Sequence, residues 1–222
     1  MTEAAATVAR DADAVRYIVL RKLSSGLRHT LMGELQSIQF LAELSTRQMA
    51  AGADPAKTRD CVGKISAATA GAITTCHSVI DWLRPDPKAT TTLRDAVAQC
   101  VQLAGDDWRM RGTQATVALS DAAGGVRVSK PAARELIVAS LLTLTDQQRG
   151  PLDVEVTGEL AGDRVLLRAR AKTTTRGSPL PASTIYQALD WSDVAALAAA
   201  HGVDCSCVDG AAVLGFPMSP PG

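Results

Sequence analysis

Apolar and polar residues alternate with the period of an α-helix through the first part of the chain. The repeat runs from about Ala12 to Ala50 and again from about Pro55 to Leu83, with an apolar side chain every three or four residues. Because residues at this spacing lie on one face of a helix, the pattern predicts two long helices. Asp54 and Pro55 are typical of a helix start, and Pro85 ends the second repeat.

Two helices joined by so short a turn would pack as an antiparallel hairpin. The side chains expected to face inward from the second helix are Val62, Ile65, Ala72, Ile73, Cys76, Val79, Ile80 and Leu83. A hairpin alone covers one side of each apolar stripe, and a second copy of the chain would cover the other. We therefore expect a homodimer in which two hairpins form a four-helix bundle.

The pattern changes after residue 87, where shorter segments of helical and strand-like periodicity follow one another. Helices are predicted over about 92–111, 131–147 and 183–201, and strands over about 112–119, 126–128, 152–157, 164–170 and 211–216. This order is typical of an α+β fold in which helices pack on a mixed sheet. The sequence thus predicts a helical hairpin domain over residues 1–87 and an α/β domain over residues 88–222, with residues 217–222 as a disordered tail.

Composition narrows the classes of function. Lys plus Arg and Asp plus Glu number 23 each, and aromatic residues make up 3% of the chain. Neither a basic patch nor a base-stacking platform is indicated, so we expect no nucleic-acid partner. No apolar run approaches the ~20 residues that span a bilayer, and residues 1–5 lack the character of a signal peptide. We expect a soluble, cytoplasmic protein without a membrane partner.

The cysteines indicate neither a disulfide framework nor a metal site. Cys61, Cys76 and Cys100 fall among apolar helical positions, where we interpret them as reduced core thiols. Cys205 and Cys207 lie near His201 in the sequence, but no second pair of ligands completes a zinc site. We expect no bound metal.

His29 is the candidate for chemistry. Leu27, Leu31 and Leu35 share one face of the first helix, and at ~100° per residue His29 lies on the opposite face. A helix that buries those leucines holds the imidazole in solvent, where it can act as a nucleophile. The pattern alone leaves open the alternative of a solvated histidine without a role.

Other side chains are weaker candidates for a catalytic role. His77 lies beside the apolar stripe of the second helix and is interpreted as a packing or boundary residue. His201 follows three alanines near a helix end, where it would interact with the last carbonyls. Ser24, Ser25 and Ser37 have no identifiable histidine and acid partners, so a hydrolase triad is not indicated.

The order of elements and the residues around His29 resemble the core of a sensor histidine kinase, in which a phosphoacceptor hairpin precedes an ATPase domain. The kinase box reads His, acid, Leu, Arg, Thr or Asn, Pro and Leu, with an Ile three residues later. The corresponding residues here are His29, Thr30, Leu31, Met32, Gly33, Glu34, Leu35 and Ile38. Residues 93–119 and 126–144 and the His201-Gly202 pair follow the order of the ATPase domain, so the resemblance covers residues 12–216.

Three nucleotide-binding motifs of the kinases are missing from this chain. The asparagine box, which holds Mg²⁺ through side-chain oxygens, is replaced by residues 139–146, and the chain contains no asparagine. The adenine-reading Asp-x-Gly-x-Gly motif is replaced by residues 172–177, and the glycine-rich phosphate lid by residues 190–196. The resemblance therefore implies a degenerate ATPase-like α/β sandwich that does not bind ATP.

The phosphoacceptor box departs from the kinases as well. Thr30 stands where the kinases have the acid that activates the histidine. Gly33 stands where they have the Thr or Asn that positions water for phosphatase action, and Glu34 replaces a helix-bending proline. These departures speak against autokinase and phosphatase activity, whereas transfer onto and off an exposed imidazole needs none of these residues.

The resemblance thus extends to kinase-like histidine phosphotransferases that lack ATP binding. In this interpretation His29 is the catalytic residue and passes phosphoryl groups to and from the aspartates of response-regulator receiver domains. Arg28, Thr30, Met32 and Gly33 are the expected contacts with the partner. No cofactor is expected in this chain, because the receiver domain would bring Mg²⁺. Two alternatives remain: an inactive pseudokinase that sequesters a response regulator or another regulator, and a divergent active kinase.

Overall fold

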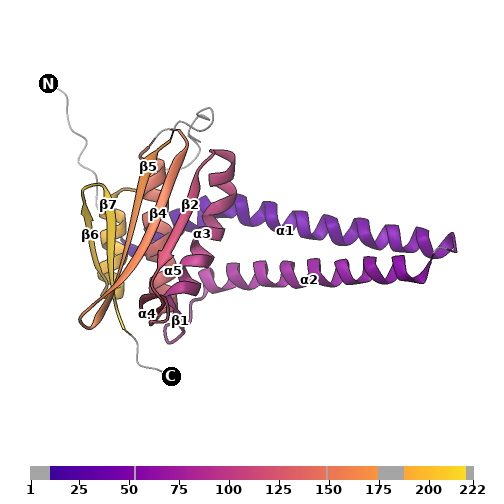
Figure 1. The fold of residues 1–222 in the computed structure, drawn as a ribbon, viewed down its shortest axis with the longest axis horizontal. Helices are drawn as coiled ribbons and strands as arrows, with labels where there is room; N and C mark the ends of the chain where they lie inside the picture. Colours follow the sequence, from indigo (N-terminus) through magenta and orange to yellow (C-terminus); the bar gives the residue numbers. More distant parts are fainter. Residues whose placement is uncertain (1–10, 53, 149, 175–187, 219–222) are drawn as a thin grey trace. The chain divides into compact units, whose positions relative to one another are not determined.

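The chain folds as an α+β protein with a long N-terminal helical hairpin and a mixed β-sheet (Figure 1). The structure is a computed structural model that describes residues 11–52, 54–148, 150–174 and 188–218. It divides into two compact units. We call residues 24–85 the hairpin unit, and the segments up to residue 23 and from residue 86 onwards the α/β unit.

Helices α1 (Ala12–Ala50) and α2 (Pro55–Leu83) have the bounds that the sequence predicts. Asp54 caps α2, because its side chain accepts a hydrogen bond from the Ala56 backbone N–H at 2.9 Å. Pro55 fills the first turn, where a missing N–H costs no hydrogen bond. Local capping therefore fixes where the second helix begins.

Few side chains of the hairpin unit are fully buried. Ser45, Cys61, Ala72 and Trp82 are buried. A Cβ at Gly71 would meet the Glu34 carboxylate, so a larger residue there requires that side chain to move. The two helices thus pack along one narrow face.

Five of the eight apolar positions predicted to face inward from α2 are exposed instead. Val62, Ile73, Ile80 and Leu83 are 54%, 52%, 55% and 67% exposed. Cys76, interpreted from the sequence as a core thiol, is exposed as well. The stripe is wider than the face that one neighbouring helix can cover, which is why the inward assignment was wrong for these positions.

The α/β unit is built on a five-stranded sheet with the strand order β2-β4-β5-β7-β6. Its strands are β2 (Gln114–Leu119), β4 (Leu152–Ala161), β5 (Arg164–Thr173), β6 (Asp204–Val208) and β7 (Ala211–Pro217). The β2–β4 pair is parallel and the other pairs are antiparallel, so the sheet is mixed as expected. A separate two-stranded sheet consists of β1 (Thr90–Thr92) and β3 (Arg127–Ser129), and α4 (Asp121–Gly124) is a single turn.

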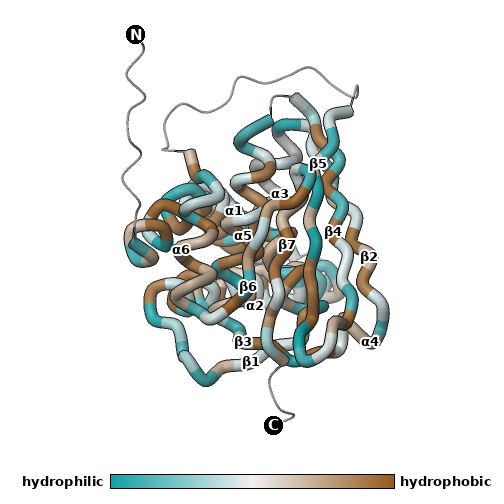
Figure 2. Tube along the Cα trace, turned by 90° about the vertical axis from the view of Figure 1, so that its left-hand side faces the viewer, coloured by the Kyte–Doolittle hydropathy of each residue, from teal (hydrophilic) through white to brown (hydrophobic). Residues whose placement is uncertain are grey.

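Helices α3 (Leu93–Met110), α5 (Lys130–Asp146) and α6 (Trp191–His201) pack against this sheet (Figures 1 and 2). Helix α5 is the centre of the unit, since every residue from Pro131 to Thr145 is buried. It contacts α3, α6, β5 and β7. Other elements surround this helix on all sides, so its polar residues, among them Arg134 and Glu135, are buried together with the apolar ones.

The first turns of α1 belong to the α/β unit rather than to the hairpin unit. Val15 and Val19 are fully buried there, and Leu23 is 5% exposed. The sequence boundary at residue 87 places this segment in the hairpin domain, whereas the structure divides helix α1 between the two units. The apolar repeat continues without a break through residue 23, so no local signal marks the division.

Several boundaries differ from the sequence prediction. The last helix was expected from about residue 183, but α6 begins at Trp191, where Asp190 and Asp193 form a capping box. Residues 183–187 and 219–222 lie outside the described residues, and Pro217 ends β7 instead of opening a tail. Elements β1, α4 and β6 were not predicted, because each is only three to five residues long. Within the described ranges, no helix has the length and apolarity that crossing a membrane requires.

Candidate functional site

His29 lies in the part of α1 that belongs to the hairpin unit, and its side chain is exposed, as the helical pattern predicts. Leu27 and Leu31, on the opposite side of the helix, are half-buried, whereas Leu35, predicted on the same buried face, is 46% exposed. No side chain in the described part of the chain hydrogen-bonds to the His29 ring. The imidazole is therefore open to a partner molecule from solvent.

The four residues predicted to contact a partner lie on different sides of His29. At ~100° per residue, Gly33 and Met32 fall within roughly 60° of His29, while Arg28 and Thr30 lie about 100° away on either side. Arg28 and Gly33 are exposed, Met32 is 48% exposed, and Thr30 is half-buried. Gly33 and Met32 thus share the face of His29, and Thr30 turns toward the interior of the hairpin unit.

Glu34, which stands where kinases have proline, points toward α2. Its Oε2 accepts a hydrogen bond from Thr75 Oγ1 at 3.4 Å, beside Gly71. By helical spacing it lies about 140° from His29. Its carboxylate therefore stabilises the helix pair and does not take the place of the activating acid that Thr30 lacks.

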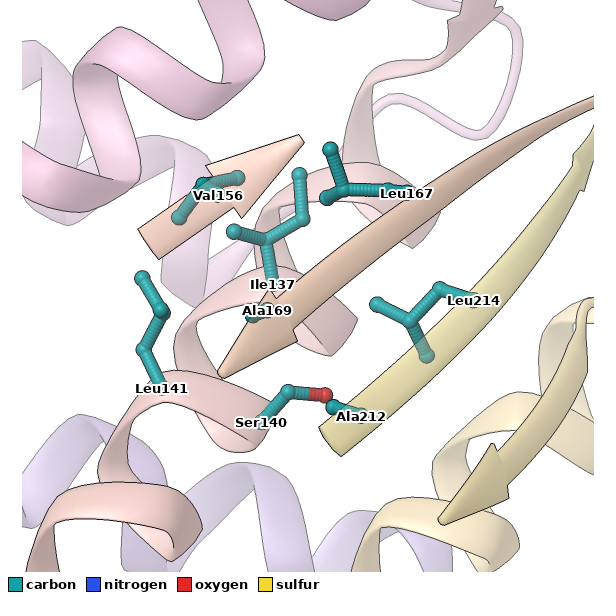
Figure 3. A pocket seen from close by; sticks show the side chains of 8 residues that line it. All are labelled: Ile137, Ser140, Leu141, Val156, Leu167, Ala169, Ala212 and Leu214. Carbon is teal, nitrogen blue, oxygen red and sulfur yellow. The ribbon is translucent and has the colours of Figure 1, made fainter. Parts of the chain in front are cut away.

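The segment that replaces the asparagine box lies within α5 and is buried. Ser140 Oγ and Thr143 Oγ1 face the interior without a hydrogen-bond partner among the described residues. The adjoining cavity measures about 10 Å³, against roughly 300 Å³ for the smallest typical ligand pockets. Its lining, shown in Figure 3, is Ile137, Ser140, Leu141, Val156, Leu167, Ala169, Ala212 and Leu214. These residues do not fit a nucleotide or its Mg²⁺, because they offer one hydroxyl and no carboxylate or amide oxygen.

The other two replaced motifs are only partly described. Lys172 and Thr173 continue strand β5, while residues 175–177 lie outside the described residues. Residues 190–196 form the N-cap and first turns of α6, and Asp193 is buried within the capping box. The residues that replace the kinase phosphate lid thus cap and begin helix α6.

A buried ionic cluster in the α/β unit was not predicted. His201 Nε2 lies 2.8 Å from Glu135 Oε2, and Arg16 Nε donates to the same oxygen at 2.7 Å. Arg16 also pairs with Asp13 at 2.5 Å. Glu135 is 2% exposed, so its carboxylate is compensated by these neighbours rather than by water. His201 therefore binds a carboxylate instead of the helix-end carbonyls expected from the sequence.

The pKa of Glu135 reflects this environment. Burial acts to raise it, but hydrogen bonds and charge from His201 and Arg16 outweigh burial and hold it below its ordinary value. The three residues are 66 and 119 positions apart along the chain, so no sequence spacing could have brought them together. Their arrangement joins α1, α5 and α6 within the unit.

The cysteines differ in environment. Cys61 and Cys100 are buried, Cys205 is half-buried, and Cys207 is exposed on strand β6. All are free thiols, and burial raises the pKa of Cys100 to about 12. Among the described residues, no group of His, Cys, Asp and Glu side chains gathers as metal ligands would. His201 lies near Cys205 and Cys207 in the sequence, but its ring contacts Glu135.

No family model matches the chain. An acetyl-hydrolase of Streptomyces hygroscopicus is 25% identical over 187 residues, which is 76% of this chain and 60% of that protein. The chain thus spans less than two thirds of the length of that relative. The sequence has no G-x-S-x-G motif, which carries the nucleophile in many serine hydrolases.

Three solved structures illustrate the distant similarities. The catalytic domain of the histidine kinase ThkA gives a TM-score of 0.43 at 12% identity, over 60% of this chain and 98% of that chain. The Acinetobacter baumannii histidine kinase AdeS gives 0.42 at 8%, over 85% and 98%. A bacterial phosphotransferase gives 0.41 at 15%, over 89% and 95%. Scores in this range do not establish a common fold, and the residues themselves have to support any function.

Proposed function

We propose that this protein is a histidine phosphotransferase of a two-component phosphorelay. His29 would carry phosphoryl groups to and from the aspartates of response-regulator receiver domains. The observation that supports this most directly is the exposed His29 ring in the middle of a long helix, with no hydrogen-bond partner among the described residues. A ring held in this way can enter the active site of another protein without breaking any contact of its own.

The reaction needs only one unprotonated ring nitrogen from this chain. That nitrogen attacks the phosphorus of an aspartyl phosphate, and the N–P bond forms as the P–O bond to the aspartate breaks. The carboxylate leaves with the electron pair, and the second ring nitrogen keeps its proton. The reverse reaction returns the phosphoryl group to an aspartate. Mg²⁺ bound by the receiver domain would neutralise charge on the phosphoryl oxygens.

The surroundings of α5 support transfer without ATP. The residues in place of the asparagine box are buried, and the adjoining cavity of about 10 Å³ is far smaller than a nucleotide. At His29, Thr30 supplies no carboxylate and Glu34 is bonded to Thr75. An autokinase would need both a nucleotide site and an activating group.

We further propose that two copies form a four-helix bundle. The apolar side chains exposed on the hairpin unit are Met32, Leu35, Phe40, Met49, Val62, Ile73, Ile80 and Leu83. Ile73 and Ile80 are seven residues apart, and Leu35 and Met49 are fourteen apart. Seven-residue spacing is typical of helices that pack against partner helices along their length. A second hairpin packed on the faces of Leu35, Met49, Ile73 and Ile80 would remove those side chains from water, while Met32 and Phe40 stay on the His29 face.

The alternative is a pseudokinase without chemistry that binds and sequesters a response regulator or another regulator. The substitutions at Thr30 and Gly33 favour it, because they remove the side chains that kinases use for activation and phosphatase action. Under this alternative the exposed helix face around His29 still contacts the partner, but no phosphoryl group moves.

Labelling with a phosphorylated receiver domain separates these functions. We expect acid-labile, alkali-stable label on the wild-type chain and none on His29→Ala. The matched control is His77→Ala, since His77 is the other exposed histidine of the hairpin unit and its loss should leave labelling intact. Binding of the receiver without label would favour the pseudokinase. Labelling from ATP alone would contradict the assignment of the α/β unit.

A further inference from the structure

Cys205 and Cys207 lie on the same face of strand β6, at one edge of the five-stranded sheet (Figure 1). They are two residues apart, and side chains at that spacing point to the same side of a strand. Across the ladder they pair with Leu214 and Ala212, whose side chains line the cavity next to α5. The two thiols therefore lie side by side on the helix-covered face of the sheet.

Both thiols are free, and the pair is open to solvent at one end. Cys207 is exposed and Cys205 is half-buried. Strand β6 pairs only with β7 in the described part of the chain, so no strand covers its other edge there. The residue opposite Cys207 is Ala212, which has no long side chain to cover the thiol. An ion from solvent can thus reach Cys207 directly and Cys205 from the same side.

The spacing of the two residues favours a bridging cation over a disulfide. Successive positions on one side of a strand are ~6.8 Å apart, and their Cβ atoms project in parallel. A disulfide needs Cβ atoms only ~3.8 Å apart, so it would require the strand to bend. A cation bonded to both sulfurs at ~2.3 Å keeps them ~4.6 Å apart, which side chains that lean toward each other along the strand can reach.

The electrostatics of the pair point the same way. Burial raises the pKa of the Cys205 thiol, and the charge of Cys207 raises it further. Oxidation proceeds through the thiolate, so a protonated Cys205 reacts slowly with oxidants at neutral pH. A cation bound to both sulfurs removes the repulsion between them, because its positive charge lies between the two thiolates.

We propose that Cys205 and Cys207 bind a soft monovalent cation of the Cu(I) class as a pair of thiolates. Soft sulfur ligands select such ions. No third His, Cys, Asp or Glu side chain within the described ranges joins the pair, whereas structural zinc sites have four ligands. Each thiol releases its proton as its sulfur–metal bond forms, and no atom changes its oxidation state. The site is separate from His29 and does not depend on the proposed phosphotransfer.

Anaerobic titration of the reduced chain with Cu(I), in competition with the chelator bathocuproine disulfonate, tests the site. We expect the chain to take up one Cu(I) from the chelator. Cys205→Ser and Cys207→Ser should each lower the affinity at least ~100-fold, because a single thiolate loses the advantage of two ligands held together. The matched control is Cys76→Ser, since Cys76 is an exposed thiol of the hairpin unit and its loss should leave the affinity unchanged.

The pH dependence of binding gives a second readout, which wild type alone provides. Two protons leave for each ion bound, so below the thiol pKa the affinity should rise ~100-fold per pH unit, against ~10-fold for either serine variant. Equal affinities of wild type and the serine variants would overturn the site. So would a complex of one Cu(I) with two chains, because thiols of different copies would then hold the ion. Zn²⁺ bound as tightly as Cu(I) would contradict a site of two ligands.

Discussion

Arg16 of α1 and Glu135 of α5 form an ion pair in which Arg16 Nε lies 2.7 Å from Glu135 Oε2. Lys22 forms a second ion pair, with Asp146 at the end of α5. Arg111 Nη1 lies 3.5 Å from the same carboxylate. Together with the buried Val15 and Val19, these pairs make the start of α1 a structural part of the α/β unit. The chain therefore passes between the two units twice, once within α1 and once after α2.

Replacing Glu135 with glutamine should destabilise the α/β unit. The substitution removes the charge that both Arg16 and His201 contact, and hydrogen bonds to charged groups contribute about 1.5–3 kcal/mol. We expect the free energy of unfolding, measured by urea denaturation, to fall by about 2–3 kcal/mol. The control is Glu159→Gln, an exposed glutamate of β4, which should change stability by less than ~0.5 kcal/mol. Equal effects of the two substitutions would contradict a stabilising role for the cluster.

The same cluster predicts how stability depends on pH. Burial acts to raise the pKa of Glu135, but the hydrogen bonds from His201 and Arg16 lower it by more. Its pKa in the folded protein therefore lies below the ordinary value. Its contribution is therefore present above pH ~4.3, the ordinary pKa of a glutamate, and is lost as the pH falls through the lowered pKa. The free energy of unfolding, measured from pH 6 downwards in roughly half-unit steps, should fall less with acid for Glu135→Gln than for wild type. Parallel curves would indicate that Glu135 does not contribute.

Alanine substitutions at Gly33 and Gly71 should affect stability differently. Gly33→Ala gains helix propensity, up to ~1 kcal/mol, and meets no neighbour. Gly71→Ala gains the same propensity, but its Cβ displaces the Glu34 carboxylate and weakens the bond to Thr75, which is worth ~0.5–1.5 kcal/mol. We expect the melting temperature to rise clearly for Gly33→Ala and to change little for Gly71→Ala. A larger rise for Gly71→Ala would mean that Glu34 finds an equivalent position elsewhere.

The long helices could be predicted from the sequence because their signals are local. The apolar repeat and the Asp54-Pro55 start set the bounds of α1 and α2 to the residue. Exposure of His29 followed from the same repeat, since Leu27 and Leu31 lie on the more buried side, although Leu35 of the same repeat is exposed. The role of His29 stays a prediction, and so do the contacts assigned to Arg28, Thr30, Met32 and Gly33.

Features that depend on distant contacts could not be predicted. The Arg16, Glu135 and His201 cluster depends on the packing of α1 and α6 against α5, which no spacing in the sequence encodes. The exposure of Ile73 and Ile80 was missed because an apolar stripe does not reveal how many helices will cover it. Strand β6 was missed because it has only five residues and lies at the sheet edge, where most of its side chains are exposed.

The exposed face of α2 leads to the prediction on assembly. If a second hairpin covers Ile73 and Ile80, the double substitution Ile73→Glu with Ile80→Glu would bury charges against apolar side chains, and the dimer should dissociate. Sedimentation equilibrium should give a dimer mass for wild type and a monomer mass for the double variant. Val117→Glu is the control, since Val117 of β2 is 44% exposed in the α/β unit and its substitution should leave the mass unchanged. A wild-type monomer would contradict the four-helix bundle. A dimer that survives both glutamates would mean that copies associate through another face, because two unpaired charges cannot remain within an apolar helix interface.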